Sequence, residues 1–132
     1  MDTNPLVTEE IDTGAELAAR FRQSVPVEAA FWINPSDDGR WALYIASPEF
    51  NNANYDRGYR EILRLAQEMR TPYIDPFQVR LIGTDDPLAK AADEINRKFP
   101  GPVPTRFRGT NFGGMSVEEV YIYKLNNLSP AC

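Results

Sequence analysis

The chain has 132 residues, of which 42% are hydrophobic, 11% aromatic and 25% charged, values that are ordinary for one globular domain with a substantial core. Its formal net charge is −5. This charge argues against a general nucleic-acid coat and against a membrane-surface helix, because both classes need an excess of Lys and Arg.

Two residue types that carry much of enzyme chemistry are absent or nearly so. There is no histidine, and Cys132 is the only cysteine. Ser-His-Asp catalysis, Cys-His catalysis, histidine metal sites and thiolate metal sites are therefore excluded. We expect no cofactor and no metal, and the residue content favours a protein that is not an enzyme.

The N-terminal residues and the hydrophobic runs bear on location. Residues 1–5 are polar and acidic, which is not the form of a secretory signal. No run approaches the roughly 18 apolar residues that a bilayer crossing requires. The expected compartment is the cytoplasm, without membrane association.

The first predicted element is a helix that begins at Thr8, after a flexible tail at 1–7, and ends before Pro26. Acidic residues in its first turn suit the positive end of the helix dipole. Apolar residues follow at steps of three and four, at Ile11, Ala15, Ala18, Phe21 and Val25. Gly14 weakens the middle of this helix by about 1 kcal/mol relative to alanine.

Val27 to Ser47 predicts a β-hairpin, because apolar residues alternate on both sides of a Pro/Ser/Asp/Gly cluster at 35–39. Both strands carry apolar residues on both of their faces. The predicted register pairs Ile33 with Trp41, Phe31 with Leu43, Ala29 with Ile45, Trp32 with Ala42 and Ala30 with Tyr44. In this register large residues lie opposite small ones on the second face, which favours cross-strand packing.

Two further helices and one strand follow. Residues 54–69 predict a helix with Asn54 as its cap, and residues 77–83 predict a third strand that alternates from Phe77 and ends at Gly83. Asp86 as a cap and Pro87 at the first helical position predict a helix that ends before Pro100.

Residues 104–110 and 117–125 predict a last hairpin, whose turn at 111–114 contains two glycines that can adopt positive φ. The predicted fold is a single α+β domain over residues 8–125, with flexible tails at 1–7 and 126–132. We expect two layers, with three helices on one face of an about five-stranded mixed or antiparallel sheet in the order α-β-β-α-β-α-β-β.

Strand alternation collects aromatic and arginine side chains on the face opposite the helices. The predicted binding face consists of Trp32, Tyr44, Arg80, Arg106, Arg108, Tyr121 and Tyr123. Aromatic rings interleaved with guanidinium groups stack on planar groups, hold anions and are typical of interface hot spots. Two alternatives in which this face binds no partner remain open: the first helix covers this face, or the side chains are solvated singly.

The leading hypothesis is a small non-catalytic binding module that presents this face to a protein partner or to a second copy of itself. The competing hypothesis is an arginine-dependent binder or enzyme acting on a phosphorylated small molecule or on single-stranded nucleic acid, although the acidic charge disfavours nucleic acid. In that case Arg80, Arg106 and Arg108 would hold phosphate, and Asp75, Asp85 or Asp86 would act as a base or metal ligand.

Overall fold

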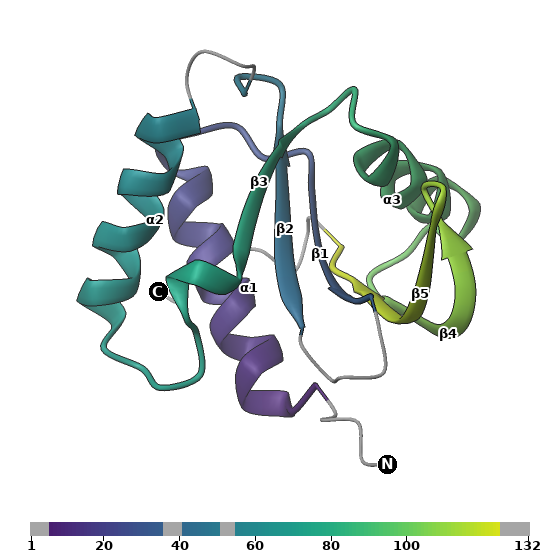
Figure 1. Ribbon diagram of the computed structural model, residues 1–132, viewed down its shortest axis with the longest axis horizontal. Coiled ribbons are helices and arrows are strands. Elements are labelled where there is room, and N and C mark those ends of the chain that lie inside the picture. Colours follow the sequence, from purple (N-terminus) through teal and green to yellow (C-terminus); the bar gives the residue numbers. More distant parts are fainter. Residues whose placement is uncertain (1–5, 36–40, 51–54, 125–132) are drawn as a thin grey trace.

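The computed structural model describes residues 6–35, 41–50 and 55–124 (Figure 1). Its elements are α1 (Thr8–Arg22), β1 (Ala29–Asn34), β2 (Ala42–Ser47), α2 (Tyr55–Met69), the 3₁₀ turn η1 (Pro76–Gln78), β3 (Val79–Gly83), α3 (Pro87–Lys98), β4 (Thr105–Phe112) and β5 (Met115–Ile122). The first hairpin turn, the Asn54 cap, the 126–132 tail and Cys132 lie outside the described residues.

Within the described residues the strands form one sheet in the order β3-β2-β1-β5-β4. β2 and β3 are parallel, with α2 as their crossover, and the other three neighbouring pairs are antiparallel. The predicted α+β fold, its order of elements, its mixed sheet and its three helices are therefore confirmed for this part of the chain.

The layers differ from the two-layer prediction, because helices lie on both faces of the sheet (Figure 1). α1 and α2 pack on the face that carries Trp32 and Leu43, which we call the α1/α2 face. α3 packs on the face that carries Phe31 and Ile33, which we call the α3 face. All six residues of β1 are buried, and a central strand that is apolar on both sides needs cover on both sides.

The register of the first hairpin differs from the prediction by one residue. Phe31 lies opposite Tyr44, and Trp32 lies opposite Leu43. A slip of one residue moves every side chain of a strand to the other face relative to its partner. The alternation could not select the register because both faces are apolar. In the observed register the Phe31 and Tyr44 rings stack, with their centroids 5.4 Å apart and an angle of 3° between the ring planes.

Local signals set several element ends. Asp86 caps α3 by accepting a hydrogen bond from Leu88 N at 2.8 Å, as predicted. The last hairpin turns at Gly113 and Gly114, both with positive φ. Its turn is therefore shorter than the predicted 111–114 turn, because the paired strands extend to Phe112 and from Met115. Leu6, assigned to a flexible tail, is buried in the core beneath α1 and α2.

β3 begins two residues later than predicted, at Val79. The preceding residues form η1, whose N-cap is Asp75 and whose first residue is Pro76. Proline at this position favours a helical turn over an extended strand. Phe77 therefore lies on the turn and not on the strand.

Candidate functional site

The predicted binding face does not form as one surface. Trp32, Tyr121 and Arg106 lie side by side across β1, β5 and β4 on the α1/α2 face. Tyr44 and Arg80 lie opposite each other on the α3 face. Because β3 and β4 are the two edges of the sheet, the structure separates Arg80 from both Arg106 and Arg108.

α1 covers the aromatic centre of this predicted face. Trp32 is 0% exposed, and its Nε1–H donates to Tyr123 Oη at 2.8 Å. The Tyr123 hydroxyl in turn donates to Ile11 O in α1 at 2.6 Å. A Cβ on Gly14 would lie 2.7 Å from Tyr123 Oη, so this glycine lets the helix approach closely.

The expectation of an open second face is therefore wrong for Trp32 and Tyr123. Burial raises the pKa of the Tyr123 phenol well above its usual range, against a smaller opposing effect of its hydrogen bond with Trp32. These two residues form a structural pair under α1 and are not available to a partner.

Part of the predicted set does come together on the outer part of the sheet. Arg106 forms an ion pair with Glu119, and Arg108 approaches the same carboxylate at 3.6 Å. Arg106 Cζ lies 6.0 Å from the ring centroid of Tyr121. Both arginines share one internal carboxylate, so their charge is partly neutralised within the fold.

The acids proposed as a base or metal ligands have no common site. Asp75 and Asp86 each cap a turn or helix, which is the usual structural use of Asp at such positions. Among the residues that the structure describes, no group of three or more His, Cys, Asp or Glu side chains could hold a metal ion.

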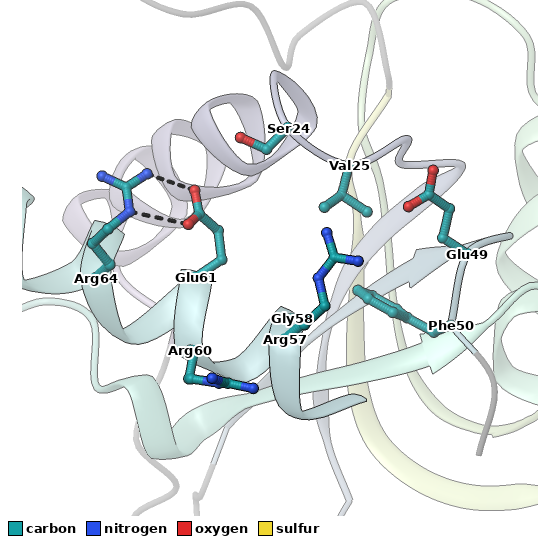
Figure 2. Close-up of a pocket in the computed structure, with 9 residues that line it drawn as sticks. All are labelled: Ser24, Val25, Glu49, Phe50, Arg57, Gly58, Arg60, Glu61 and Arg64. Atoms are coloured by element: carbon teal, nitrogen blue, oxygen red, sulfur yellow. Dashed lines mark hydrogen bonds and ion pairs between the residues drawn. The ribbon is translucent and has the colours of Figure 1, made fainter. Parts of the chain in front are cut away.

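Two hollows that the sequence prediction did not include flank α2. The first, which we call the arginine hollow, has a volume of about 330 Å³ and lies between the end of α1, the segment after β2 and α2 (Figure 2). Its lining includes Glu49, Phe50, Arg57, Arg60, Glu61 and Arg64. Gly58 is buried at its floor, where a Cβ would lie 2.8 Å from the Phe50 ring.

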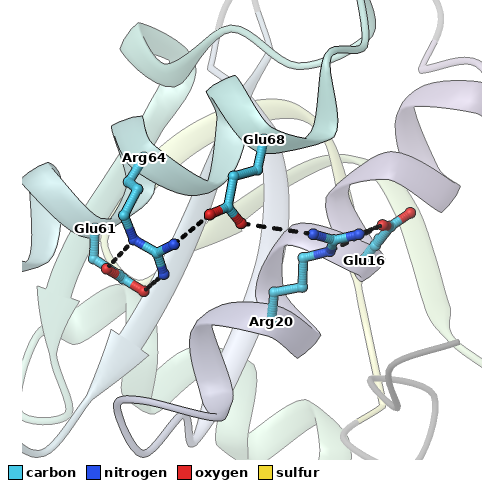
Figure 3. Close-up of polar contacts among 5 residues, drawn as sticks. All are labelled: Glu16, Arg20, Glu61, Arg64 and Glu68. Carbon is cyan, nitrogen blue, oxygen red and sulfur yellow. Dashed lines mark hydrogen bonds and ion pairs between the residues drawn. The ribbon is translucent and has the colours of Figure 1, made fainter. Parts of the chain in front are cut away.

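Two residues that line the arginine hollow, Glu61 and Arg64, belong to a chain of ion pairs that continues beyond it. Arg64 contacts Glu61 at 2.6 Å and Glu68 at 2.5 Å, and Arg20 of α1 lies 4.0 Å from Glu68 and 2.7 Å from Glu16 (Figure 3). The hydrogen bond from Arg64 lowers the pKa of Glu61. Exposed ion pairs contribute about 0–1 kcal/mol each, so this chain mainly positions side chains.

The second hollow, which we call the Phe77 groove, has a volume of about 440 Å³ and lies between α2 and η1. It is lined by Asp56, Tyr59, Arg60, Leu63, Pro76 and Phe77. Phe77 is 82% exposed, the largest value among the exposed large hydrophobic residues in the described ranges. Arg60 lines both hollows.

The backbone beneath Phe77 is firmly held. Phe77 N donates to Asp75 Oδ1 at 2.9 Å, and Asp75 N donates to the Gln78 side chain at 3.2 Å. Gln78 Nε2 donates to Trp41 O at 3.3 Å, which joins η1 to the chain just before β2. Arg80 Nη1 donates to Phe77 O at 2.6 Å.

The free edge of β3 is also occupied by side chains of this protein. Leu81 N donates to Tyr59 Oη at 3.0 Å, and Arg80 lies along the edge through its bond to Phe77 O. Bonds of this kind protect an edge strand from pairing with another chain. A partner in the Phe77 groove would therefore dock by side-chain contacts.

Comparisons with protein-family models, with curated proteins and with solved structures found no match for this chain. Within the described part of the chain, no helix is both long enough and apolar enough to cross a membrane.

The sequence contains a local signal at each hollow, and the alternation pattern obscured the one at Phe77. Asp75, Pro76 and Gln78 have the spacing of a capped turn, with an acidic cap and a glutamine three residues later, which removes Phe77 from the strand. Arg57, Arg60 and Arg64 recur at steps of three and four, which places them on one side of α2.

Proposed function

We propose that this protein is an interaction module that forms a two-fold dimer, with Phe77 of each copy seated in the Phe77 groove of the other. The proposal keeps the hypothesis of a binding module that contacts a second copy of itself. It moves the docking surface from the sheet face to α2 and η1, because α1 covers Trp32 and Tyr123.

The observation that carries the proposal is an exposed aromatic ring on a rigid turn. Phe77 is 82% exposed, yet its N–H and C=O are both hydrogen-bonded to side chains of the same protein. A backbone that is already ordered loses little conformational entropy when a partner covers the side chain that it carries. Rigid aromatic residues that fill pockets are typical interface hot spots.

The groove beside Phe77 provides the matching cavity. Tyr59 and Leu63 lie one helical turn apart on α2 and are 38% and 44% exposed. A two-fold interface uses the same patch twice, so the patch must contain both a projecting group and a hollow. The Phe77 groove contains both.

The charges at the groove are also self-complementary. Asp56 and Arg60 lie one turn apart on its rim, and the structure's described residues provide no ion-pair partner for either side chain. Arg60 Nε makes only a 3.4 Å contact with the backbone O of Asp56. Across a two-fold axis, Asp56 of one copy meets Arg60 of the other, and the reverse pair forms by symmetry.

Light scattering after size exclusion, from dilute protein to about 100 µM, tests the proposal. We expect a weak dimer with a dissociation constant on the order of 10 µM, because the patch falls at the small end of transient interfaces. Phe77→Ser should abolish the dimer, and Val103→Ser, at a 74% exposed apolar residue outside the groove, should leave it intact. A monomeric wild type across this range would overturn the proposal.

A charge-reversal series tests the geometry independently. Asp56→Arg places two like charges opposite each other at both symmetric contacts, so the dimer should weaken. Arg60→Asp should do the same, and the double variant should restore association because opposite charges meet again. If the double variant associates no better than either single variant while circular dichroism shows all to be folded, the two-fold arrangement is wrong.

A further inference from the structure

We infer that the arginine hollow is a binding site for a small phosphorylated or carboxylated metabolite, whose anionic group is held by Arg57. This site is separate from the dimer contact, because Arg57 does not line the Phe77 groove. The inference retains the anionic ligand of the competing sequence hypothesis and assigns it to other residues.

The size and lining of the hollow suit a small molecule. Its volume of about 330 Å³ falls at the lower end of the range for ligand pockets, about 300–1,000 Å³. Val25 and Phe50 supply apolar walls, and Ser24 and Arg57 supply polar groups. Figure 2 shows the Arg57 guanidinium projecting into the space between Val25, Phe50 and Glu49.

Arg57 is a cation that lines this hollow and not the Phe77 groove, whereas Arg60 lines both. Glu61 and Glu68 hold Arg64, whereas the described residues include no hydrogen-bond or ion-pair partner for Arg57. Its fixed fork of N–H donors matches the oxygens of a phosphate or carboxylate. An anion here would pair with a charge for which the described residues provide no partner.

The walls are positioned before any ligand binds. The ion pairs from Glu61 through Arg64 and Glu68 to Arg20 join α2 to α1 along one side (Figure 3). Gly58 allows the Phe50 ring to close the floor. A hollow that needs little rearrangement loses less free energy on binding.

The apolar lining narrows the class of ligand. Val25 and Phe50 line the hollow beside Arg57, and apolar walls with a few polar groups are typical of sites for small organic molecules. A bare anion gains nothing from these walls, whereas an anionic group attached to a carbon skeleton contacts both Arg57 and the walls. Sugar phosphates, nucleotides and hydroxy acids have this combination.

Thermal unfolding of the full chain with inorganic phosphate, ribose 5-phosphate, adenosine monophosphate and malate tests the inference. Ligand binding to the native state raises the unfolding midpoint, and we expect at least one of the three organic anions to raise it more than phosphate does. Isothermal titration with that ligand should give one site per chain. No shift with any of the four probes would overturn the inference.

Two arginine variants locate the site. Arg57→Gln should weaken binding by about 10- to 100-fold, since a hydrogen bond to a charged group is lost. Arg97→Gln should not change it, because Arg97 is on α3, which packs on the opposite face of the sheet from α1 and α2, and it pairs with Asp93. Equal binding by wild type and Arg57→Gln would place the ligand elsewhere and overturn the assignment.

Phe77→Ser separates this inference from the proposed dimer. That variant lacks the projecting ring but keeps Arg57 and the Glu61–Arg64 ion pair, so it should bind the ligand as the wild type does. Loss of ligand binding in Phe77→Ser would show that the hollow depends on the dimer and would contradict an independent site.

Discussion

Trp32 and Phe77 are both large aromatic residues, one on the sheet and one beside it, and their surroundings are opposite. Trp32 lies on a central strand, 0% exposed, beneath α1. Phe77 lies on a turn before an edge strand, 82% exposed. The difference shows that cover by a helix, and not membership of an aromatic face, decides which ring can meet a partner.

The polar groups around the two rings explain this contrast. The Trp32 indole N–H is paired with Tyr123, which is itself bonded to α1. Beneath Phe77 the hydrogen bonds join only backbone and polar side chains. The ring of Trp32 therefore contributes to folding, whereas that of Phe77 contributes little to the stability of one copy.

The largest expected effect is the loss of stability on truncating Trp32, and comparing it with truncation of Phe77 tests this contrast directly. Trp32→Ala removes a fully buried side chain and should lower the free energy of unfolding by about 3–5 kcal/mol. Phe77→Ala should change it by less than about 0.5 kcal/mol in a monomeric sample, as is usual for an exposed position. Urea unfolding of both variants at low protein concentration gives the comparison, and similar losses in the two would contradict it.

Gly14→Ala tests how closely α1 packs against Trp32 and Tyr123. Alanine favours a helix by about 1 kcal/mol, but its Cβ would lie 2.7 Å from Tyr123 Oη and 2.9 Å from the Trp32 ring. Overpacking in a buried contact costs about 1–3 kcal/mol, so we expect net destabilisation. If Gly14→Ala is stabilising, α1 does not pack against the two rings as described.

A double-mutant cycle provides the control for Gly14→Ala. Tyr123→Phe removes the nearest atom, so Gly14→Ala should cost less in that background than in the wild type. Additive losses would show that the Tyr123 hydroxyl does not limit the approach of α1.

Tyr123→Phe by itself should cost about 1–3 kcal/mol, because it leaves the buried Trp32 N–H without its acceptor and removes the hydrogen bond to Ile11 O. Tyr73→Phe is the matched control, since Tyr73 is 42% exposed on the surface. Its loss should be within about 0.5 kcal/mol. Equal losses in equilibrium unfolding would mean that the Trp32–Tyr123 pair contributes nothing specific.

Asp75→Ala should have a smaller effect on stability, at the turn η1 that carries the exposed Phe77. The variant removes the carboxylate that accepts from Phe77 N, and loss of an N-cap costs about 1 kcal/mol. Because η1 then orders less well, the dimer should weaken while the core stays folded. Wild-type association of Asp75→Ala would show that the ordered turn does not matter for docking.

The same contrast explains which parts of the fold were predictable from sequence. Helix positions follow from periodic apolar residues and from caps such as Asp86 before Pro87, which act within a few residues. The hairpin register depends on which of two apolar faces each strand presents, and one-residue shifts satisfy the alternation equally well. The predicted site inherited that ambiguity, so Trp32 and Tyr44 were placed together although they lie on opposite faces.

The two hollows were harder to predict for a different reason. Arg57 and Phe50 are close only because α2 crosses back over the end of β2, and that placement depends on tertiary packing. The exposure of Phe77 had a local signal in the Asp75 cap. The alternation of Phe77 with Val79 and Leu81 concealed it, because a strand pattern extended across a turn looks continuous.

The smallest expected effect is an alkaline loss of stability on the covered side. Burial raises the pKa of Tyr123 in the folded protein, whereas an unfolded tyrosine titrates near pH 10. Above about pH 10 the unfolded chain has lost a proton that the folded chain keeps, so stability falls as pH rises. Near pH 10.5 this single group should cost no more than about 1 kcal/mol relative to neutral pH.

Tyr123→Phe isolates that loss, because the raised pKa values of Tyr44 and Tyr121 affect both proteins alike. Urea unfolding at neutral pH and near pH 10.5 should show a steeper decline for wild type than for the variant. Parallel declines would mean that Tyr123 releases its proton as readily when folded as when unfolded. The phenol would then reach solvent past α1, and the contrast between the covered ring of Trp32 and the exposed ring of Phe77 would be smaller than the structure indicates.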